Sequence, residues 1–234
     1  MSPKLLALLG SALLSGTALA EGAATVSFLT GSARRTHAGQ TSALAMGGSV
    51  AAGDEVATGT ASRLELTLAD RSVVRLGPSS KLTLREAELS SDGAKKFSAK
   101  LLLGKLWAKV ASTLGGESHF DVETDNAVAG VRGTTFRVDA HHDRSVLVRV
   151  YAGAVAVAAA NRLPMMAHAS TRQEVAGPTE VDKHTYEKLV ARMMQVHVSA
   201  AGELGEPESF TAESEAKDRW VAWNEQRDDG AGGR

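Results

Sequence analysis

Two consecutive strand patterns, the first of which contains two glycines, constrain this chain more than any other feature. Residues 127–136 contain Gly130 and Gly133, which permit backbone angles that a residue with a Cβ resists. Residues 146–157 then alternate valine with other residues, as a strand with one buried face does. A polar turn over residues 139–145 separates the two stretches. The sequence here predicts neighbouring β-strands joined by a turn.

Short strand patterns of the same kind recur over residues 25–160. Residues 63–68 alternate strictly between polar and apolar side chains, and residues 101–110 form a longer candidate strand. The 23 glycines of the 234-residue chain supply turns between short strands, and this composition favours an all-β fold. Three glycines instead interrupt candidate strands, where glycine usually marks a bend or a close backbone approach. We expect these three to form similar corners of one compact architecture: Gly31, Gly104 and Gly153.

The glycine-containing element resembles a motif of the FecR domain, an all-β periplasmic module of recognition and signalling. The residues that carry the resemblance are Gly130, Val131, Arg132, Gly133, Thr134 and Phe136. Further stretches resemble the rest of that domain in the expected order, and they are residues 53–66, 70–80, 103–107 and 153–157. The resemblance implies a compact β-sandwich or short β-helical module over residues 21–160. Arg132, between two glycines, is expected either to satisfy carbonyls of its own turn or to face a partner.

The first twenty residues have the pattern of a secretory signal peptide, residues 1–20. Lys4 precedes an apolar run over residues 5–14, and the small residues Ala18 and Ala20 precede the expected cleavage site. The run is shorter than the roughly 20 apolar residues of a membrane span. We therefore expect a periplasmic or secreted protein with no membrane span after cleavage. Well-known FecR proteins carry a sigma-factor-binding region and a membrane helix before this domain, so the resemblance carries over the periplasmic module and not the anti-sigma activity.

The composition changes after the β-domain. Residues 161–207 read as a connection with one helix, which begins near Thr179 and continues to about residue 195 at helical apolar spacing. Residues 208–234 read as a second helix followed by a disordered tail from residue 228, and together these segments form a small α-helical extension. Trp220 and Trp223 lie in that second helix, which is otherwise polar, so they must be buried. Packing on the β-domain and insertion into a partner's groove are both open, and we expect the helix to act as a latch.

Groups that carry chemistry are sparse in the sequence. The chain has no cysteine, and no serine stands in a Gly-x-Ser-x-Gly context. His141 and His142 would point to opposite faces of a strand, so a solvated turn is expected there rather than a metal site. With 26 basic and 27 acidic residues the chain lacks the basic excess typical of nucleic-acid binding. The sequence predicts a protein that is not an enzyme and that has no cofactor and no nucleic-acid partner.

These observations favour a non-catalytic periplasmic protein-interaction module in envelope signalling or assembly. Its expected partner is a periplasmic or outer-membrane protein, bound through a surface or an exposed sheet edge. Glycan or cell-wall binding is an alternative that would use Trp107 as an exposed aromatic, although a core position beside Leu106 is also expected for that residue. A purely structural envelope role is a further alternative. The candidate interaction residues are Trp107, Trp220 and Trp223.

Overall fold

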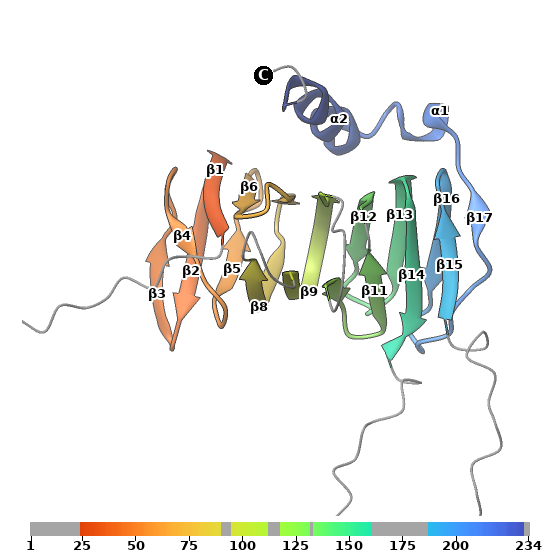
Figure 1. Ribbon diagram of the computed structural model, residues 1–234, viewed down its shortest axis with the longest axis horizontal. Helices are drawn as coiled ribbons and strands as arrows, with labels where there is room; N and C mark the ends of the chain where they lie inside the picture. The colour runs from red at the N-terminus through yellow and green to blue at the C-terminus, as the bar shows by residue number, and fades with distance from the viewer. Residues whose placement is uncertain (1–23, 90–94, 112–117, 132, 161–186, 232–234) are drawn as a thin grey trace, which may run out of the picture.

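The fold is a β-sandwich with two short C-terminal helices, as the all-β prediction required (Figure 1). The structure, a computed structural model, describes residues 24–89, 95–111, 118–131, 133–160 and 187–231. These residues form seventeen strands in two layers, between which the chain passes repeatedly. The predicted signal peptide lies outside the described residues. Among the described residues, none of the helices has the length and apolar character needed to cross a membrane.

Each layer is a sheet in which all neighbouring strands are antiparallel except one pair, β9 and β10. Sheet A consists, in spatial order, of β4 (Ser49–Val50), β1 (Ala24–Thr30), β6 (Arg63–Leu68), β7 (Val73–Leu76), the second part of β9 (Lys95–Lys109), β12 (Thr135–Ala140), β13 (Val146–Ala152), β16 (Met194–Val198) and β17 (Glu208–Ser209). Sheet B consists of β3 (Gln40–Ala43), β2 (Ala33–His37), β5 (Glu55–Thr58), β8 (Lys81–Leu89), the first part of β9, β10 (His119–Glu123), β11 (Ala127–Val131), β14 (Ala154–Ala159) and β15 (Glu187–Ala191). The predicted strand at residues 63–68 is β6, and residues 101–109 are the last part of β9. The patterns at residues 127–136 and 146–157 are each divided between the sheets, as β11 with β12 and as β13 with β14.

The core lies between the two sheets. The alternating valines of β13 point into it, as do the leucines of β6, because successive side chains of a strand point to opposite faces. Phe97 and Phe120 stack there with ring centroids 4.2 Å apart, and Phe136 meets Phe120 edge-on. Removing this apolar surface from water is the main stabilising contribution to such a fold.

The three predicted corner glycines are the points at which the chain crosses from one sheet to the other. Gly31 joins β1 to β2, Gly153 joins β13 to β14, and Gly104 lies inside β9 where that strand leaves sheet B for sheet A. Their φ angles are 77°, 82° and 95°, in the left-handed region that favours glycine. The expectation of similar corners is therefore confirmed.

A hydroxyl-bearing residue from a neighbouring turn fills the space beside each corner. At Gly104 a Cβ would lie 2.3 Å from the Oγ of Ser80, and that Oγ accepts a hydrogen bond from the backbone N–H of Lys105. Ser62 makes the corresponding contact beside Gly31. Glycine is therefore required at these corners both by its backbone angles and by the close approach of a second turn.

The helix expected within residues 161–207 is not present in the described part of that segment. Residues 187–198 form a hairpin, β15 and β16, that extends both sheets, so the sandwich continues beyond the predicted boundary at residue 160. Val190 and Val196 are fully buried on the inner faces, while Met193, with φ of 60°, makes the turn. The apolar residues of this segment fit a helical spacing by coincidence, but β-branched valines pack better on a sheet. Residues 179–186, where that helix was expected to begin, lie outside the described residues.

The predicted C-terminal helix, Thr211 to about Arg227, is present but divided into two helices, and the second ends later than expected. α1 (Ala212–Glu215) is capped by Thr211, and α2 (Arg219–Ala231) carries both predicted tryptophans. The prediction of disorder from residue 228 was wrong as far as Ala231, because Asp228 is bound to the sandwich and keeps the last turns of α2 in place. In Figure 1, α2 lies across several strands along one side of the sandwich.

Candidate protein-interaction site

One row of neighbouring residues crosses the outer face of sheet A. Strand register places its members side by side on consecutive strands from β6 to β16. Each is preceded or followed in its strand by a buried core residue, so the side chains of the row point away from the core. We name this set the charged row: Glu65, Arg75, Trp107, Arg137, Arg149 and Gln195. Residues 208–228 cover it.

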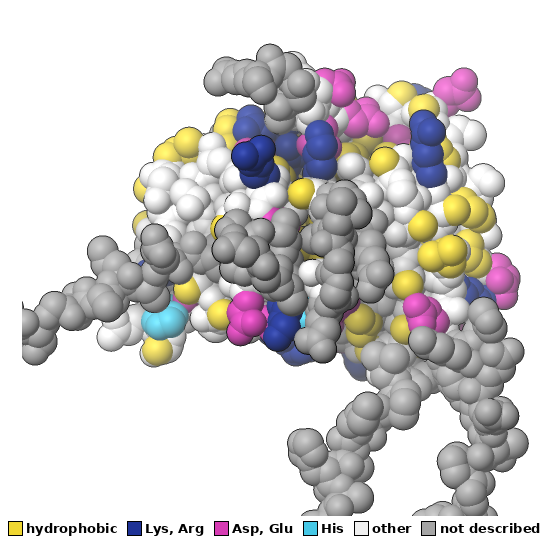
Figure 2. Space-filling view, in the orientation of Figure 1, with side chains coloured by type: hydrophobic (Ala, Val, Ile, Leu, Met, Phe, Trp, Pro, Cys, Tyr) yellow, Lys and Arg dark blue, Asp and Glu magenta, His cyan; other side chains and the backbone are white. Residues whose placement is uncertain are grey.

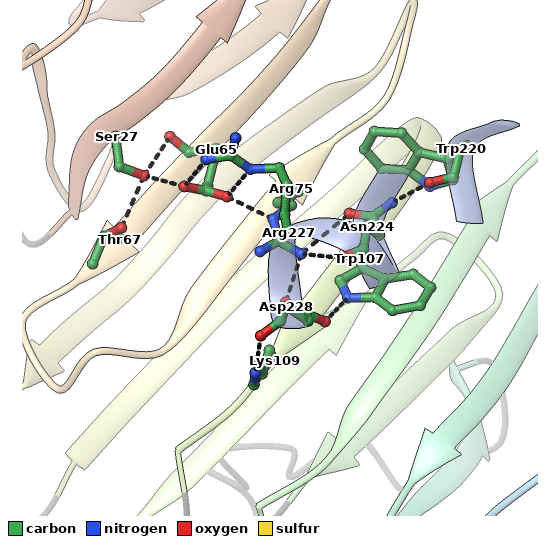
Figure 3. A network of polar contacts seen from close by, with 10 residues as sticks. All are labelled: Ser27, Glu65, Thr67, Arg75, Trp107, Lys109, Trp220, Asn224, Arg227 and Asp228. Carbon is green, nitrogen blue, oxygen red and sulfur yellow. Dashed lines mark hydrogen bonds and ion pairs between the residues drawn. The ribbon is translucent and has the colours of Figure 1, made fainter. Parts of the chain in front are cut away.

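Glu65 is the centre of the first group of ion pairs, shown in Figure 3. Its carboxylate accepts hydrogen bonds at 2.7 Å from the guanidinium groups of Arg75 and Arg227 and from the hydroxyl of Ser27. Burial alone would raise the pKa of Glu65, but these three donors outweigh it and lower the pKa to about 2. Glu65 is therefore held as a carboxylate at every physiological pH.

Asp228 of α2 joins three members of the sandwich. Its carboxylate forms an ion pair with Arg75 at 2.8 Å and accepts a hydrogen bond from the indole N–H of Trp107 at 3.1 Å. Its backbone carbonyl accepts a hydrogen bond from Lys109 at 3.2 Å. Asn224, one turn earlier, is fully buried and accepts a hydrogen bond from Arg75. These contacts attach the last turns of α2 to β7 and β9 (Figure 3).

Arg137 is the centre of the second group of ion pairs. Asp139 and Asp218 lie 2.7 Å and 2.8 Å from its guanidinium nitrogens. Burial alone would lower the pKa of Arg137. The hydrogen bond to Asp139 and the negative charge of that residue have the larger effect together with the other acidic neighbours, and the pKa is raised. Glu215 continues the group, since it pairs with Arg149 at 3.2 Å and accepts a hydrogen bond from the hydroxyl of Tyr151 at 2.7 Å. Burial, with this hydrogen bond, raises the pKa of Tyr151.

Aromatic rings fill the space between the two groups. Trp107 packs on Tyr151 with ring centroids 4.4 Å apart, and Trp220 stacks on Trp223 at 5.2 Å. Trp223 is partly exposed and lies against the guanidinium of Arg63 at 5.2 Å, a cation–π geometry. These rings form a cluster with Val221 that is separate from the sandwich core.

The three candidate tryptophans therefore meet at one site. Of the two arrangements left open for Trp220 and Trp223, the structure has the one in which α2 packs on its own β-domain. Trp107 is buried, with 1% of its surface exposed, but it is not a residue of the sandwich core beside Leu106. Adjacent strand residues point to opposite faces, so Leu106 enters the core and Trp107 enters the cluster under α2.

The family-motif residues lie elsewhere, and two of them, Gly133 and Thr134, contact the corner at Gly153. Gly130 and Val131 belong to β11, while Phe136 is buried in the core. Thr134 is buried, and its methyl group would lie 2.6 Å from a Cβ at Gly153. Gly133, with φ of 61°, precedes it in the turn. Arg132 lies outside the described residues.

A second surface feature occurs on the outer face of sheet B. A shallow hollow of about 370 Å³ is lined by His119, Asp121, Gly130 and Leu189, among others. Burial raises the pKa of Asp121. His141, as expected, is exposed in the turn between β12 and β13, and the described residues contain no group of side chains that could hold a metal ion.

The charged members of the row were missed by sequence reasoning. Glu65, Arg75 and Arg137 occupy the polar positions of alternating strands, where solvated side chains are expected. Their partners come from a distant part of the chain, since Arg75 bonds to a residue 149 positions away. One sequence signal for this site was the pair of tryptophans in an otherwise polar helix, because two such large apolar side chains need a surface that buries them.

Comparison with known proteins places the central part of the chain in a family. The family model described as FecR protein matches residues 54–156. Two crystal structures of a proposed anti-sigma factor from Parabacteroides distasonis ATCC 8503, at 2.50 Å and 1.65 Å, align at 20% and 21% identity with a TM-score of 0.49 in both cases. The alignments cover 68% and 72% of this chain and 61% and 63% of those chains, so less than two thirds of their length is matched. No curated protein matches the sequence. Residues 54–156, the middle of the sandwich, are a FecR domain.

Proposed function

We propose that this chain is a non-catalytic protein-interaction module that acts in envelope signalling on the outer side of the inner membrane. The FecR domain at residues 54–156 supports a regulatory role. The observation that carries the proposal is the charged row, a sheet face that already holds a polypeptide segment through paired charges and indoles. A face with this composition is suited to recognising protein, because aromatic and arginine side chains dominate the energetics of such contacts.

The chemistry of the row supports binding rather than catalysis. A side chain that transfers protons works best with a pKa near the operating pH. The pKa of Glu65 is instead lowered to about 2, and its oxygens accept hydrogen bonds from two arginines. Arg137 is similarly bound to Asp139 and Asp218. These groups are fixed charges that position a partner segment.

The proposed location follows from residues 1–20, whose pattern is that of a cleaved export signal. Cell fractionation followed by N-terminal sequencing tests it directly. We expect a mature chain that begins at Glu21 in the periplasmic fraction. Recovery of the intact chain from the cytoplasm would contradict the proposed location and, with it, the envelope role.

The glycan-binding alternative gains no support from this arrangement. That alternative needs an exposed aromatic on a β-face, and Trp107 is covered by α2 with its indole N–H bonded to Asp228. Sugar-binding aromatics stack on their ligand, which a covered ring cannot do.

In-cell photocrosslinking tests the interaction role on separate surfaces of the full-length protein. A photoreactive amino acid replaces one residue with an accessible side chain at a time: Thr41 on the edge strand β3, Leu189 on the outer face of sheet B, or Lys105 beside the charged row. We expect one discrete protein adduct from one of these surfaces and not from the other two. Absence of any protein adduct from all three, or adducts with peptidoglycan fragments alone, would contradict the proposal.

A further inference from the structure

The charged row and the segment that covers it are complementary in charge at every charged position. The basic members of the row face acidic side chains, and the single acidic member faces an arginine. Random packing of a polar tail would leave some of these charges unmatched or opposed. The pairs, in order along the row, are Glu65 with Arg227, Arg75 with Asp228, Arg137 with Asp218 and Arg149 with Glu215.

Without this cover the row is a basic surface with an aromatic centre. The row and three residues that flank it on the same strands, Lys105, Lys109 and Asp139, comprise five basic and two acidic side chains. Arg63, beside Trp223, adds a sixth basic side chain. Trp107 and Tyr151 lie between the two groups of charges. The chemistry that fits such a face is an acidic segment that also carries large aromatic side chains. Figure 2 shows basic side chains at the margin of the sandwich next to the helical segment, and acidic side chains on and beside that segment.

α2 by itself is a poor helix. Asp228 and Asp229 lie in its last turn, where the helix dipole disfavours negative charge, and that turn contains no basic residue. Gly230 follows them and lowers helix propensity further. Burial and the neighbouring acidic charges, Asp229 first, raise the pKa of Glu225. A helix of 13 residues with these features depends on the row for its stability.

The fit of α2 on the row is also incomplete. Trp220 is 4% exposed, and its indole N–H has no hydrogen-bond partner among the described residues. A buried donor without an acceptor destabilises the packed state, because its lost hydrogen bonds to water are not replaced. Trp223, its stacking partner, stays partly exposed. A partner segment that buries no unsatisfied donor at this position would avoid this cost and fit the row better than α2 does.

Release of α2 would leave the β-sandwich closed. The tryptophan cluster under α2 shares no member with the core between the sheets. The surface uncovered would consist mainly of charged side chains, which water solvates readily. The sandwich therefore retains its own core whether the row is covered by α2 or by another segment.

We infer that the charged row is a docking surface for an acidic, aromatic-bearing helix of a partner protein, and that residues 208–231 are a tethered substitute for that helix. This inference rests on the proposed function, because it names the face and the partner chemistry of that interaction. The tether gives α2 an effective concentration in the millimolar range. A partner helix of moderate affinity therefore binds only when it fits better than α2 or when α2 is weakened.

The test uses full-length protein and a fluorescent peptide of residues 211–231 as the probe helix. Asp228→Lys places a positive charge against Arg75 and Lys109, so it weakens the tethered helix and leaves the row intact. Asp229→Lys is the matched control, since it makes the same charge change at an adjacent exposed residue. We expect fluorescence anisotropy to show the peptide binding the Asp228→Lys protein at least ten-fold more tightly than the Asp229→Lys protein. Equal binding to the two variants would overturn the inference.

A charge exchange localises the contact to the row. Protein carrying Glu65→Lys should bind a peptide carrying Arg227→Glu at least ten-fold more tightly than it binds the unaltered peptide. If Glu65→Lys does not fold, as circular dichroism will report, the Asp228→Lys experiment still decides the outcome. A scrambled peptide of the same composition is the sequence control. Binding of the scrambled peptide as tightly as the native one would overturn the inference.

Other occupants give distinct results. If soluble peptidoglycan fragments or dextran sulfate displace the peptide at its own concentration, the row binds anions in general and the inference fails. If the Asp228→Lys protein forms dimers in analytical ultracentrifugation by exchanging α2, the occupant is a second copy and the inference of a separate partner fails. Failure of the proposed function is recognised separately, because it appears as absence of any protein adduct in cells. A cellular adduct confined to Leu189 or Thr41 would uphold the function and overturn this docking surface.

Discussion

Gly104 bends β9 out of one sheet and into the other, and Ser80 occupies the space where a side chain at this position would go. The serine hydroxyl accepts a hydrogen bond from the next backbone N–H, so it takes over the role of a missing sheet partner at the bend. The same arrangement of glycine and serine recurs at Gly31 and Ser62. A single long strand can therefore belong to both layers because these two residues are small and closely fitted.

Substitution of Gly104 by alanine should destabilise the fold strongly. The new Cβ would lie 2.3 Å from the Oγ and 2.6 Å from the Cα of Ser80, at a φ of 95°. Gly39→Ala is the matched control, because Gly39 has a φ of 80° with no atom within 4 Å of a Cβ. From backbone strain alone we expect Gly39→Ala to cost about 1 kcal/mol. With overpacking added, Gly104→Ala should cost about 3 kcal/mol in urea denaturation. Equal midpoints for the two variants would contradict the close approach.

Glu65 should make the docking of α2 sensitive to acid. Its pKa is lowered from 4.5 to about 2 in the fold, so the folded state favours the ionised form. The stabilisation that ionised Glu65 contributes to the folded state is fully present above about pH 4.5 and is lost as the pH falls through about 2. Tryptophan emission should therefore shift to the red across that range as α2 detaches.

Glu65→Gln is the variant that isolates this effect. Loss of the carboxylate leaves Arg75 and Arg227 without their shared partner and should cost about 3 kcal/mol at pH 7. The variant should also lose the part of the pH dependence between 4.5 and 2 that comes from Glu65, while the lowered pKa of Asp218 maintains the remainder. If wild type and Glu65→Gln shift over the same pH range with the same amplitude, Glu65 is not the responsible group.

At the scale of elements, β15 and β16 show where sequence periodicity misled. The apolar residues after Thr179 recur at a spacing that predicts a helix, yet Val190 and Val196 lie on the inner faces of two sheets. Local periodicity cannot distinguish the two outcomes over so short a stretch. The segment forms strands because β13 and β14 offer it unpaired sheet edges, and only the assembled sandwich provides those edges.

Neighbouring substitutions in β15 test this assignment. Val190 is fully buried and Leu189 is 68% exposed, as expected for a strand with one wet face. Val190→Ala should cost about 2 kcal/mol of unfolding free energy. Leu189→Ala should stay within about 0.5 kcal/mol of wild type. Thermal or urea denaturation of the two variants decides the matter, and similar losses for both would contradict the assignment.

At the scale of the whole molecule, the sandwich core and the cluster under α2 are separate bodies of packing. We expect native-state hydrogen exchange to reflect this separation. Amides of α2 should exchange through a local opening of lower free energy than amides of β6 and β13, whose side chains fill the core. Asp228→Lys should lower protection in α2 and leave β13 unchanged. Equal protection of α2 and β13 in the wild-type protein would show that the two bodies unfold as one.

How much of this structure could be predicted from the sequence depends on how far apart in the chain the interacting residues lie. The alternating strands, such as residues 63–68, and the corner glycines were predictable. In both cases a few neighbouring residues are enough to indicate the local structure. The charged row was not predictable, because its side chains are buried and paired only by a segment from the far end of the chain. Arg75 looks like a solvated residue until Asp228 and Asn224 lie against it.

The separation of the two bodies of packing has a consequence for divergence among related chains. A mutation in the row changes which helix is accepted and leaves the core intact, whereas a mutation at Gly104 changes whether the chain folds. Substitutions can therefore accumulate in the row as compensated pairs, one charge at a time. We expect positions 65 and 227 to covary across homologues, and positions 137 and 218 likewise, while Gly104 and Ser80 stay invariant. The partner specificity of such a chain can therefore change during evolution while every intermediate sequence still folds.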